Sequence, residues 1–126
     1  MKNGIKLTLA IIGVFLIICE FFYGIPFLGG SVIVSFGWQP LLFNAFLYLI
    51  LTIILLVDTQ NTIKPMVIIP ILGIIGSFVA FIPFVGMIIH WALFVLMIFF
   101  VFIVLAAPTY IPVSYTHLRA HETEAD

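Results

Sequence analysis

The sequence predicts an all-α fold, a four-helix transmembrane bundle made of two helical hairpins. Composition, long apolar runs and the turn residues between those runs are the reasons. The chain has 126 residues, of which 65% are hydrophobic and 7% are charged. Soluble domains are about half apolar and a quarter charged, and so small a domain buries too little surface to hide the excess. Lipid therefore surrounds most of this chain.

Four apolar runs approach the length that a helix needs to cross a membrane. A hydrocarbon core about 30 Å thick takes roughly 20 helical residues. Buried strands are the competing interpretation, but strands run only about 4–8 residues, and a barrel strand would alternate apolar with polar residues. We therefore expect an integral membrane domain over residues 1–112, with spans at about 6–23, 40–57, 66–82 and 85–107.

The first predicted span follows a basic N-terminus, as a signal peptide would. No A-x-A cleavage pattern follows the apolar stretch, however. The only cysteine, Cys19, is preceded by Ile18, where a lipoprotein signal needs a small residue. We therefore expect an uncleaved membrane helix.

Proline, glycine and polar residues separate the four runs. The first connection, "GIPFLGGSVIVSFGWQP", is long, and its part from Gly29 to Trp38 either lies in the membrane interface or dips into the bundle as a re-entrant piece. "DTQNTIKP" at 58–65 forms the second connection and "IPFVG" at 82–86 forms a tight third one. Pro70 lies one turn inside the third run, where we expect it to kink the helix.

Lysine positions predict the orientation, because positive residues are retained on the cytoplasmic side of a membrane. Lys2 and Lys6 precede the first span, and Lys64 lies in the second connection. We therefore expect a multi-pass protein of the plasma membrane, with its N-terminus and the 58–65 connection in the cytoplasm. The first and third connections then lie outside.

The first and third connections share an Ile-Pro-Phe-x-Gly sequence. "GIPFLG" at 24–29 and "FIPFVG" at 81–86 place this core 57 residues apart, each after an odd-numbered span. The two hairpins are therefore either an internal duplication or similar only because Pro and Gly are the usual residues between spans. With these turns, residues 5–106 loosely resemble small bacterial multi-pass membrane proteins of unassigned activity, a resemblance that implies no functional residue.

Each predicted span offers one polar group at a similar depth near its outer end: Glu20, Asn44, Ser77 and His90. Ionisable side chains in hydrocarbon are costly and indicate function. One hypothesis is that the four groups converge, with Glu20 pairing with His90 and exchanging protons with outside water. The alternative is that they lie apart, with Glu20 reaching to the surface and the Asn and Ser bonding between helices. The sequence alone favours the alternative.

The third span also carries small residues at i, i+4 spacing: Gly73, Gly76, Ser77 and Ala80. Such pairs let helices approach closely. We expect them to pack within the bundle, with self-association as the alternative.

No motif for catalysis or cofactor binding occurs in the predicted membrane domain. We find no P-loop, no dinucleotide-binding glycine pattern, no zinc-ligand spacing and no Ser-His-Asp set. We therefore expect no enzyme, no cofactor and no metal, and the lack of a basic patch argues against nucleic acid. The leading hypothesis is a non-enzymatic membrane protein that acts through other membrane proteins or itself, or as an envelope component. The alternative is a small transporter or channel subunit, proton-linked through Glu20 and His90.

The polar end of the chain, "VSYTHLRAHETEAD" at 113–126, differs from everything before it. Residues 113–123 resemble the translation of transposon-end adapter DNA used in sequencing libraries. The resemblance implies that this tail is an artefact and that the natural C-terminus is missing. We therefore do not interpret His117 and His121 as a metal-binding pair, despite their i, i+4 spacing.

Overall fold

A computed structural model describes residues 1–82 and 84–109; the tail assigned above to 113–126 lies outside the described residues. Every regular element in the described part is helical. Three helices are long and apolar enough to cross a membrane: α1 (Asn3–Gly24), α3 (Gln39–Val57) and α5 (Val85–Ala106). The all-α prediction is thus confirmed as three long apolar helices accompanied by shorter ones.

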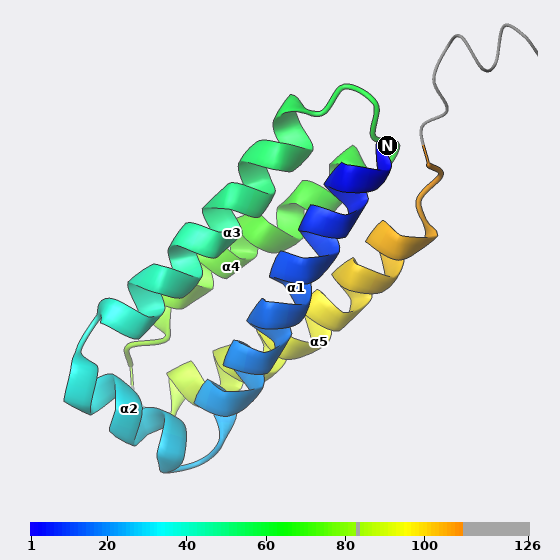
Figure 1. Ribbon diagram of the computed structural model, residues 1–126. Helices are drawn as coiled ribbons and strands as arrows, with labels where there is room; N and C mark the ends of the chain where they lie inside the picture. Colours follow the sequence, from blue (N-terminus) through cyan, green and yellow to red (C-terminus); the bar gives the residue numbers. More distant parts are fainter. Residues whose placement is uncertain (83, 110–126) are drawn as a thin grey trace, which may run out of the picture.

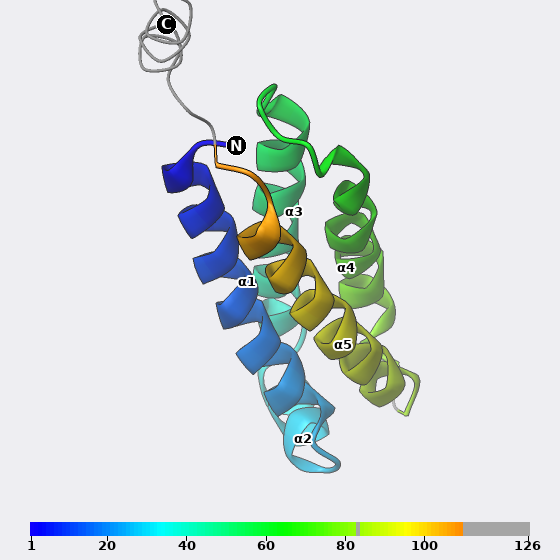
Figure 2. The same cartoon turned by 90° about the vertical axis from the view of Figure 1, so that its right-hand side faces the viewer.

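The three long helices and α4 (Ile68–Val79) run side by side, as Figures 1 and 2 show. α1 packs mainly against α5, and α3 mainly against α4. The N-terminus and the connection between α3 and α4 lie at one end, which we call the lysine end because its segments carry Lys2, Lys6 and Lys64. α2 (Leu28–Phe36) lies at the opposite end (Figure 1), which we call the IPF end.

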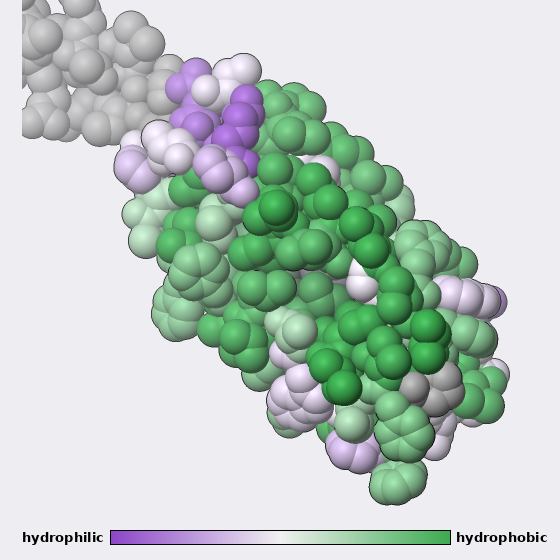
Figure 3. All heavy atoms as spheres, turned by 180° about the vertical axis from the view of Figure 1, so that it is seen from behind, coloured by the Kyte–Doolittle hydropathy of each residue, from purple (hydrophilic) through white to green (hydrophobic). Residues whose placement is uncertain are grey.

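The sides of the molecule are apolar outside as well as inside. Figure 3 shows one face that is almost wholly hydrophobic, with hydrophilic residues gathered at one end. Large side chains such as Ile11 on α1 and Phe102 on α5 are 60% and 69% exposed. Apolar surface of this extent is unusual on a soluble monomer and indicates contact with lipid or with other proteins. The long apolar helices and the apolar outer surface therefore indicate a membrane protein.

Helix ends follow the turn residues in the sequence. α1 ends at Gly24, two residues before Pro26, because the residue preceding a proline is disfavoured in helical conformation. α3 ends at Val57, where the side-chain amide of Asn61 donates to the carbonyl oxygens of Leu55 and Asp58 at 2.9 and 2.8 Å. These bonds satisfy carbonyls that the last helical turn leaves without partners.

The third predicted span, 66–82, differs from the structure in length and shape. It begins as a 3₁₀ turn, η1 (Lys64–Val67), and continues as α4 only to Val79. At about 2.0 Å per residue in the turn and about 1.5 Å in the helix, the segment is roughly 26 Å long. Pro70 lies in the first turn of α4, where a missing N–H costs nothing.

The first connection, expected as an interfacial or re-entrant piece, contains the helix α2, which contacts α1 and α3. α2 ends at Phe36 and is followed by Gly37, which has φ 67° and ψ −135°. This is a backbone conformation that glycine adopts far more readily than other residues. Gly37 therefore stops α2 and lets α3 begin in a new direction at Gln39.

The two Ile-Pro-Phe-x-Gly turns have the same backbone conformation at their phenylalanines. Their phenylalanines, Phe27 and Phe84, are the only non-glycine residues with positive φ in the described chain, at 68° and 66°. The ψ angles, −44° and −49°, agree as well. In the first turn Leu28 N–H donates to Pro26 O at 2.8 Å, which makes Phe27 the centre of a strained γ-turn.

The glycine of each turn lies against the end of the preceding helix. Gly29 N–H donates to Ile25 O at 3.0 Å, and Gly86 N–H donates to Ile82 O at 2.7 Å. A Cβ atom added at either glycine would overlap the backbone carbonyl six residues earlier, at Tyr23 or Ala80. The shared sequence thus corresponds to one shared turn structure in which glycine is required.

Candidate functional site

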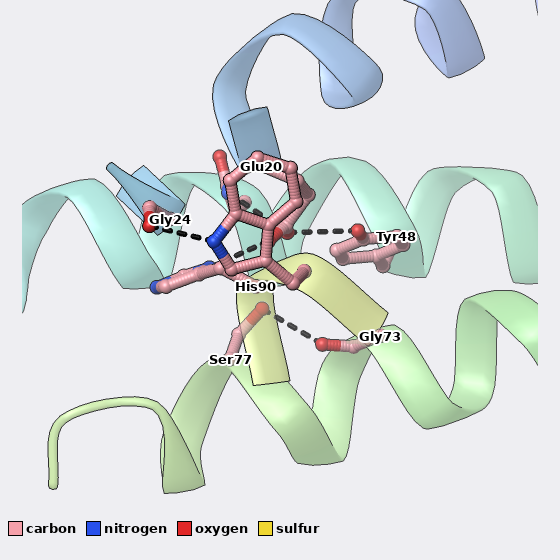
Figure 4. A network of polar contacts seen from close by, with 8 residues as sticks. Glu20, Gly24, Tyr48, Gly73, Ser77 and His90 are labelled. Carbon is pink, nitrogen blue, oxygen red and sulfur yellow. Dashed lines mark hydrogen bonds and ion pairs between the residues drawn. The ribbon is translucent and has the colours of Figure 1, made fainter. Parts of the chain in front are cut away.

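Glu20 is the centre of a buried polar cluster near the IPF end. Its side chain has no exposed surface. Glu20 Oε2 lies 2.5 Å from Nδ1 of His90, and Glu20 Oε1 accepts hydrogen bonds from the hydroxyl of Tyr48 at 2.8 Å and from Nδ2 of Asn44 at 3.3 Å. Figure 4 shows these contacts between α1, α3 and α5. We call Glu20, Asn44, Tyr48 and His90 the Glu20 cluster.

Helix periodicity explains how these side chains meet. Asn44 and Tyr48 are four residues apart on α3, so they share a face of that helix. On α1, Leu16 and Glu20 have the same spacing, and both are fully buried. His90 continues the buried face of α5 that includes Leu93 and Met97. The cluster therefore lies where three buried helix faces meet.

Ser77 is buried but does not join the cluster, in contrast to the hypothesis that all four polar groups converge. Its hydroxyl donates to Gly73 O on its own helix at 2.7 Å. Such a bond to the carbonyl four residues earlier is a common way for serine to satisfy itself within a helix. The structure thus brings together Glu20, Asn44 and His90, which the sequence alone favoured keeping apart, and leaves Ser77 separate.

Tyr48 is the cluster member that sequence reasoning missed. Tyrosine is common in apolar helices, so its type gives little indication of a role. The available signal was its spacing of four residues from Asn44 on α3. The close approach of α4 to Tyr48 depends on Gly73, because a Cβ atom at Gly73 would overlap the Tyr48 ring.

The remaining small residues of α4 face different neighbours. A Cβ atom at Gly76 would lie 3.1 Å from side-chain atoms of Ile89 and Leu93 on α5. Ala80 is buried beside Ile33 and Leu41. Gly73 and Gly76 therefore face α3 and α5, respectively, within the chain.

Trp91 strengthens the connection between α1 and α5. Its indole N–H donates to Gly24 O at 2.8 Å, one of the carbonyls at the end of α1. The ring of Tyr23 lies 5.5 Å from the ring of His90, measured between centroids. Both aromatic side chains thus lie near the Glu20–His90 pair, Trp91 as the residue after His90 and Tyr23 against the His90 ring.

Two atoms of the cluster have no hydrogen-bond partner within the described residues, His90 Nε2 and Asn44 Oδ1. His90 also lines a cavity of about 620 Å³ at the IPF end. One wall of the cavity comes from α2 and the turn before it, and the other from residues in 80–82 and 84–87. Within the cluster, both Glu20 oxygens thus have hydrogen-bond partners, whereas His90 adjoins a cavity.

No group of three or more His, Cys, Asp and Glu side chains able to hold a metal occurs within 1–82 and 84–109. No protein-family model, curated protein sequence or solved structure matches this chain. The functional interpretation therefore depends on the geometry of the cluster and the cavity.

Proposed function

We propose that the chain is a four-span protein of the plasma membrane with its N-terminus in the cytoplasm. Lys2, Lys6 and Lys64 all belong to the lysine end, and residues 1–109 contain no other lysine or arginine. Positive residues on one side of the spans favour that side for the cytoplasm. The short segment η1–α4 crosses as the fourth span, which a locally thinner bilayer accommodates at modest cost.

We infer that the protein is non-enzymatic and acts through contacts with other membrane proteins or with copies of itself. The observation that carries this proposal is that the Glu20 carboxylate is buried and fully occupied by contacts within the chain. Both of its carboxylate oxygens are engaged by groups of the same chain, from Asn44, Tyr48 and His90. A carboxylate so engaged joins three helices, and the Glu20 side chain has no exposed surface at which a substrate or an ion could approach it.

A transporter or channel subunit is the second candidate, and one observation favours it. His90 touches both Glu20 and the cavity, so it is placed to pass a proton between them. Toward the lysine end, however, the core is fully buried and apolar, at Leu9, Leu51 and Val104 among others. A proton path through a single chain would have to cross this region.

Flux measurements separate the two candidates. The full chain is reconstituted in liposomes that contain a pH-sensitive dye, and a pH gradient is applied across the membrane. We expect no flux above that of empty liposomes. A flux that is present in the native chain and lost in Glu20→Gln would replace the leading proposal with the transporter.

Crosslinking tests the proposed role of partners directly. A photoreactive amino acid is placed at Ile11 or Phe102, which face outward, and at the buried Leu16 as the control. In native membranes, the two exposed positions are expected to give discrete adducts with another protein or a second copy. Leu16 is expected to react only within the chain. Labelling of lipid alone from both exposed positions would contradict the proposal.

A further inference from the structure

The cavity at the IPF end has mainly apolar walls, and one of the residues that line it is His90, whose buried Nε2 atom has no partner among the described residues. We propose that the cavity binds an uncharged amphipathic molecule, an apolar chain with a hydroxyl group, and that the hydroxyl bonds with Nε2 of His90. This binding site goes beyond the partner-dependent role proposed above and does not depend on it.

The size and position of the cavity suit a small ligand. Its volume of about 620 Å³ falls in the range of about 300–1,000 Å³ that is usual for ligand sites. Phe27 and Phe84 contribute to its lining and are 92% and 81% exposed. The cavity therefore reaches the surface of the molecule, where an amphipathic molecule can enter from the membrane.

His90 supplies the polar contact. Its side chain is buried, and its Nδ1 is held by Glu20. Figure 4 shows the His90 ring extending from Glu20 on the side where Gly24 lies, toward the IPF end. A buried polar atom without a partner is costly, so Nε2 of His90 favours a ligand that can bond with it.

The protonation of histidine selects a hydroxyl group. When Nδ1 donates to Glu20 from a neutral ring, Nε2 accepts a hydrogen bond; when the ring is doubly protonated, Nε2 donates one. A hydroxyl group can both donate and accept, so it fits either state. An anionic head group would be repelled by the nearby Glu20 carboxylate, and a trimethylammonium head group can neither donate a hydrogen bond to Nε2 nor accept one from it.

The walls select an apolar chain. They include Ile25, Ile33, Phe81, Ile82 and Met87. Branched aliphatic and methionine side chains adapt to an alkyl or isoprenoid chain, because methionine is unbranched and flexible. Two sources have this chemistry, a neutral bilayer lipid such as a diacylglycerol and a free long-chain alcohol.

Photoaffinity labelling tests the proposal with the full chain in phosphatidylcholine nanodiscs. The probe is hexadecanol with a diazirine in its chain, and labelled peptides are mapped by mass spectrometry. We expect saturable labelling of the segments around Ile33 and Met87. Probes with the same chain and a carboxylate or trimethylammonium head group should label these segments at least tenfold more weakly.

Two variants and one control identify the site. His90→Phe removes the polar contact and should raise the probe concentration needed for half-maximal labelling about tenfold. Gly30→Leu keeps the Glu20–His90 pair and places a side chain at a lining position where a Cβ atom meets nothing within 4 Å, so saturable labelling should be lost. Gly4→Leu adds the same side chain in equally open space at the other end of α1 and should change nothing.

Competition identifies the source of the ligand. If unlabelled dioleoylglycerol and hexadecanol both displace the probe, the site accepts a bilayer lipid; if only hexadecanol does, it takes a single-chain alcohol. Either result supports a hydroxyl-bearing amphiphile. Labelling that does not saturate, that is equal for all three head groups or that persists in Gly30→Leu would overturn the proposal.

Discussion

The two Ile-Pro-Phe-x-Gly turns agree in the conformation of their phenylalanines and the hydrogen bonds of their glycines, but the helices that follow them differ. After the first turn, α2 ends after nine residues at Phe36; after the second, α5 continues for 22 residues. The positions 57 residues apart also differ in chemistry: Glu20 in α1 corresponds to Ser77 in α4, and Ile33 in α2 corresponds to His90 in α5. Of these four residues, only Glu20 and His90 belong to the Glu20 cluster.

The comparison shows that turn geometry and polar chemistry are separate properties of this chain. The turn is set locally by a phenylalanine with positive φ and a glycine against a carbonyl. The polar pair does not belong to one turn. Glu20 lies in α1, which precedes the first turn, and His90 lies in α5, which follows the second. The short α2 in turn leaves room for the cavity that His90 lines.

The largest effect is expected for the glycines that the two turns share. Gly29→Ala and Gly86→Ala would each drive Cβ into a backbone carbonyl, at Tyr23 and Ala80. Because backbone yields less than a side chain, each change should cost about 4 kcal/mol of unfolding free energy. SDS titration in mixed micelles, followed by far-UV circular dichroism, measures this. Gly30→Ala, with open space around it, is the control; equal stability of all three variants would disprove the shared turn.

A smaller effect is expected for the polar pair that the turns do not share. Glu20→Gln should cost about 2–3 kcal/mol, because it replaces hydrogen bonds to a buried charge. With His90→Gln, the double variant should be more stable than additivity predicts, by about 1–2 kcal/mol. The same titration gives all four free energies. Strictly additive losses would mean that Glu20 and His90 do not stabilise each other.

Gly37→Ala tests what ends α2 and should have a moderate effect. The conformation of Gly37, with φ 67°, strains any residue that has a Cβ atom, at about 1–2 kcal/mol. No atom lies within 4 Å of an added Cβ there, so the loss would report backbone strain alone. Gly4→Ala has equally open surroundings within α1 and should not destabilise the protein. A Gly37→Ala variant as stable as the native chain would show that another residue ends α2.

Ser77→Ala should have the smallest effect and complete the comparison with Glu20. Its hydroxyl bonds only to Gly73 O of its own helix among the described residues. Removing this bond leaves no other helix without a partner, so the unfolding free energy should change by about 0.5 kcal/mol or less. A loss as large as that of Glu20→Gln would place Ser77 in the cluster after all.

The sequence by itself determined the long apolar helices, the breaks between them and the positions of the polar residues along these helices. Long apolar runs need apolar surroundings, Pro26 and Asp58 mark helix ends, and a rise of about 1.5 Å per residue places Glu20 and His90 at one level. The length of α4 was overestimated, because apolar residues on both sides of Val79 conceal where the helix ends.

Only the tertiary structure decided which polar groups meet. Depth along a helix follows from counting residues, but the direction in which a side chain points depends on which face packs inward. In helices that are apolar all round, the sequence pattern does not distinguish an inner face. Packing against neighbours therefore turned Tyr48 toward Glu20 and left Ser77 bonded to its own helix. The same packing placed His90 between a buried carboxylate and a cavity.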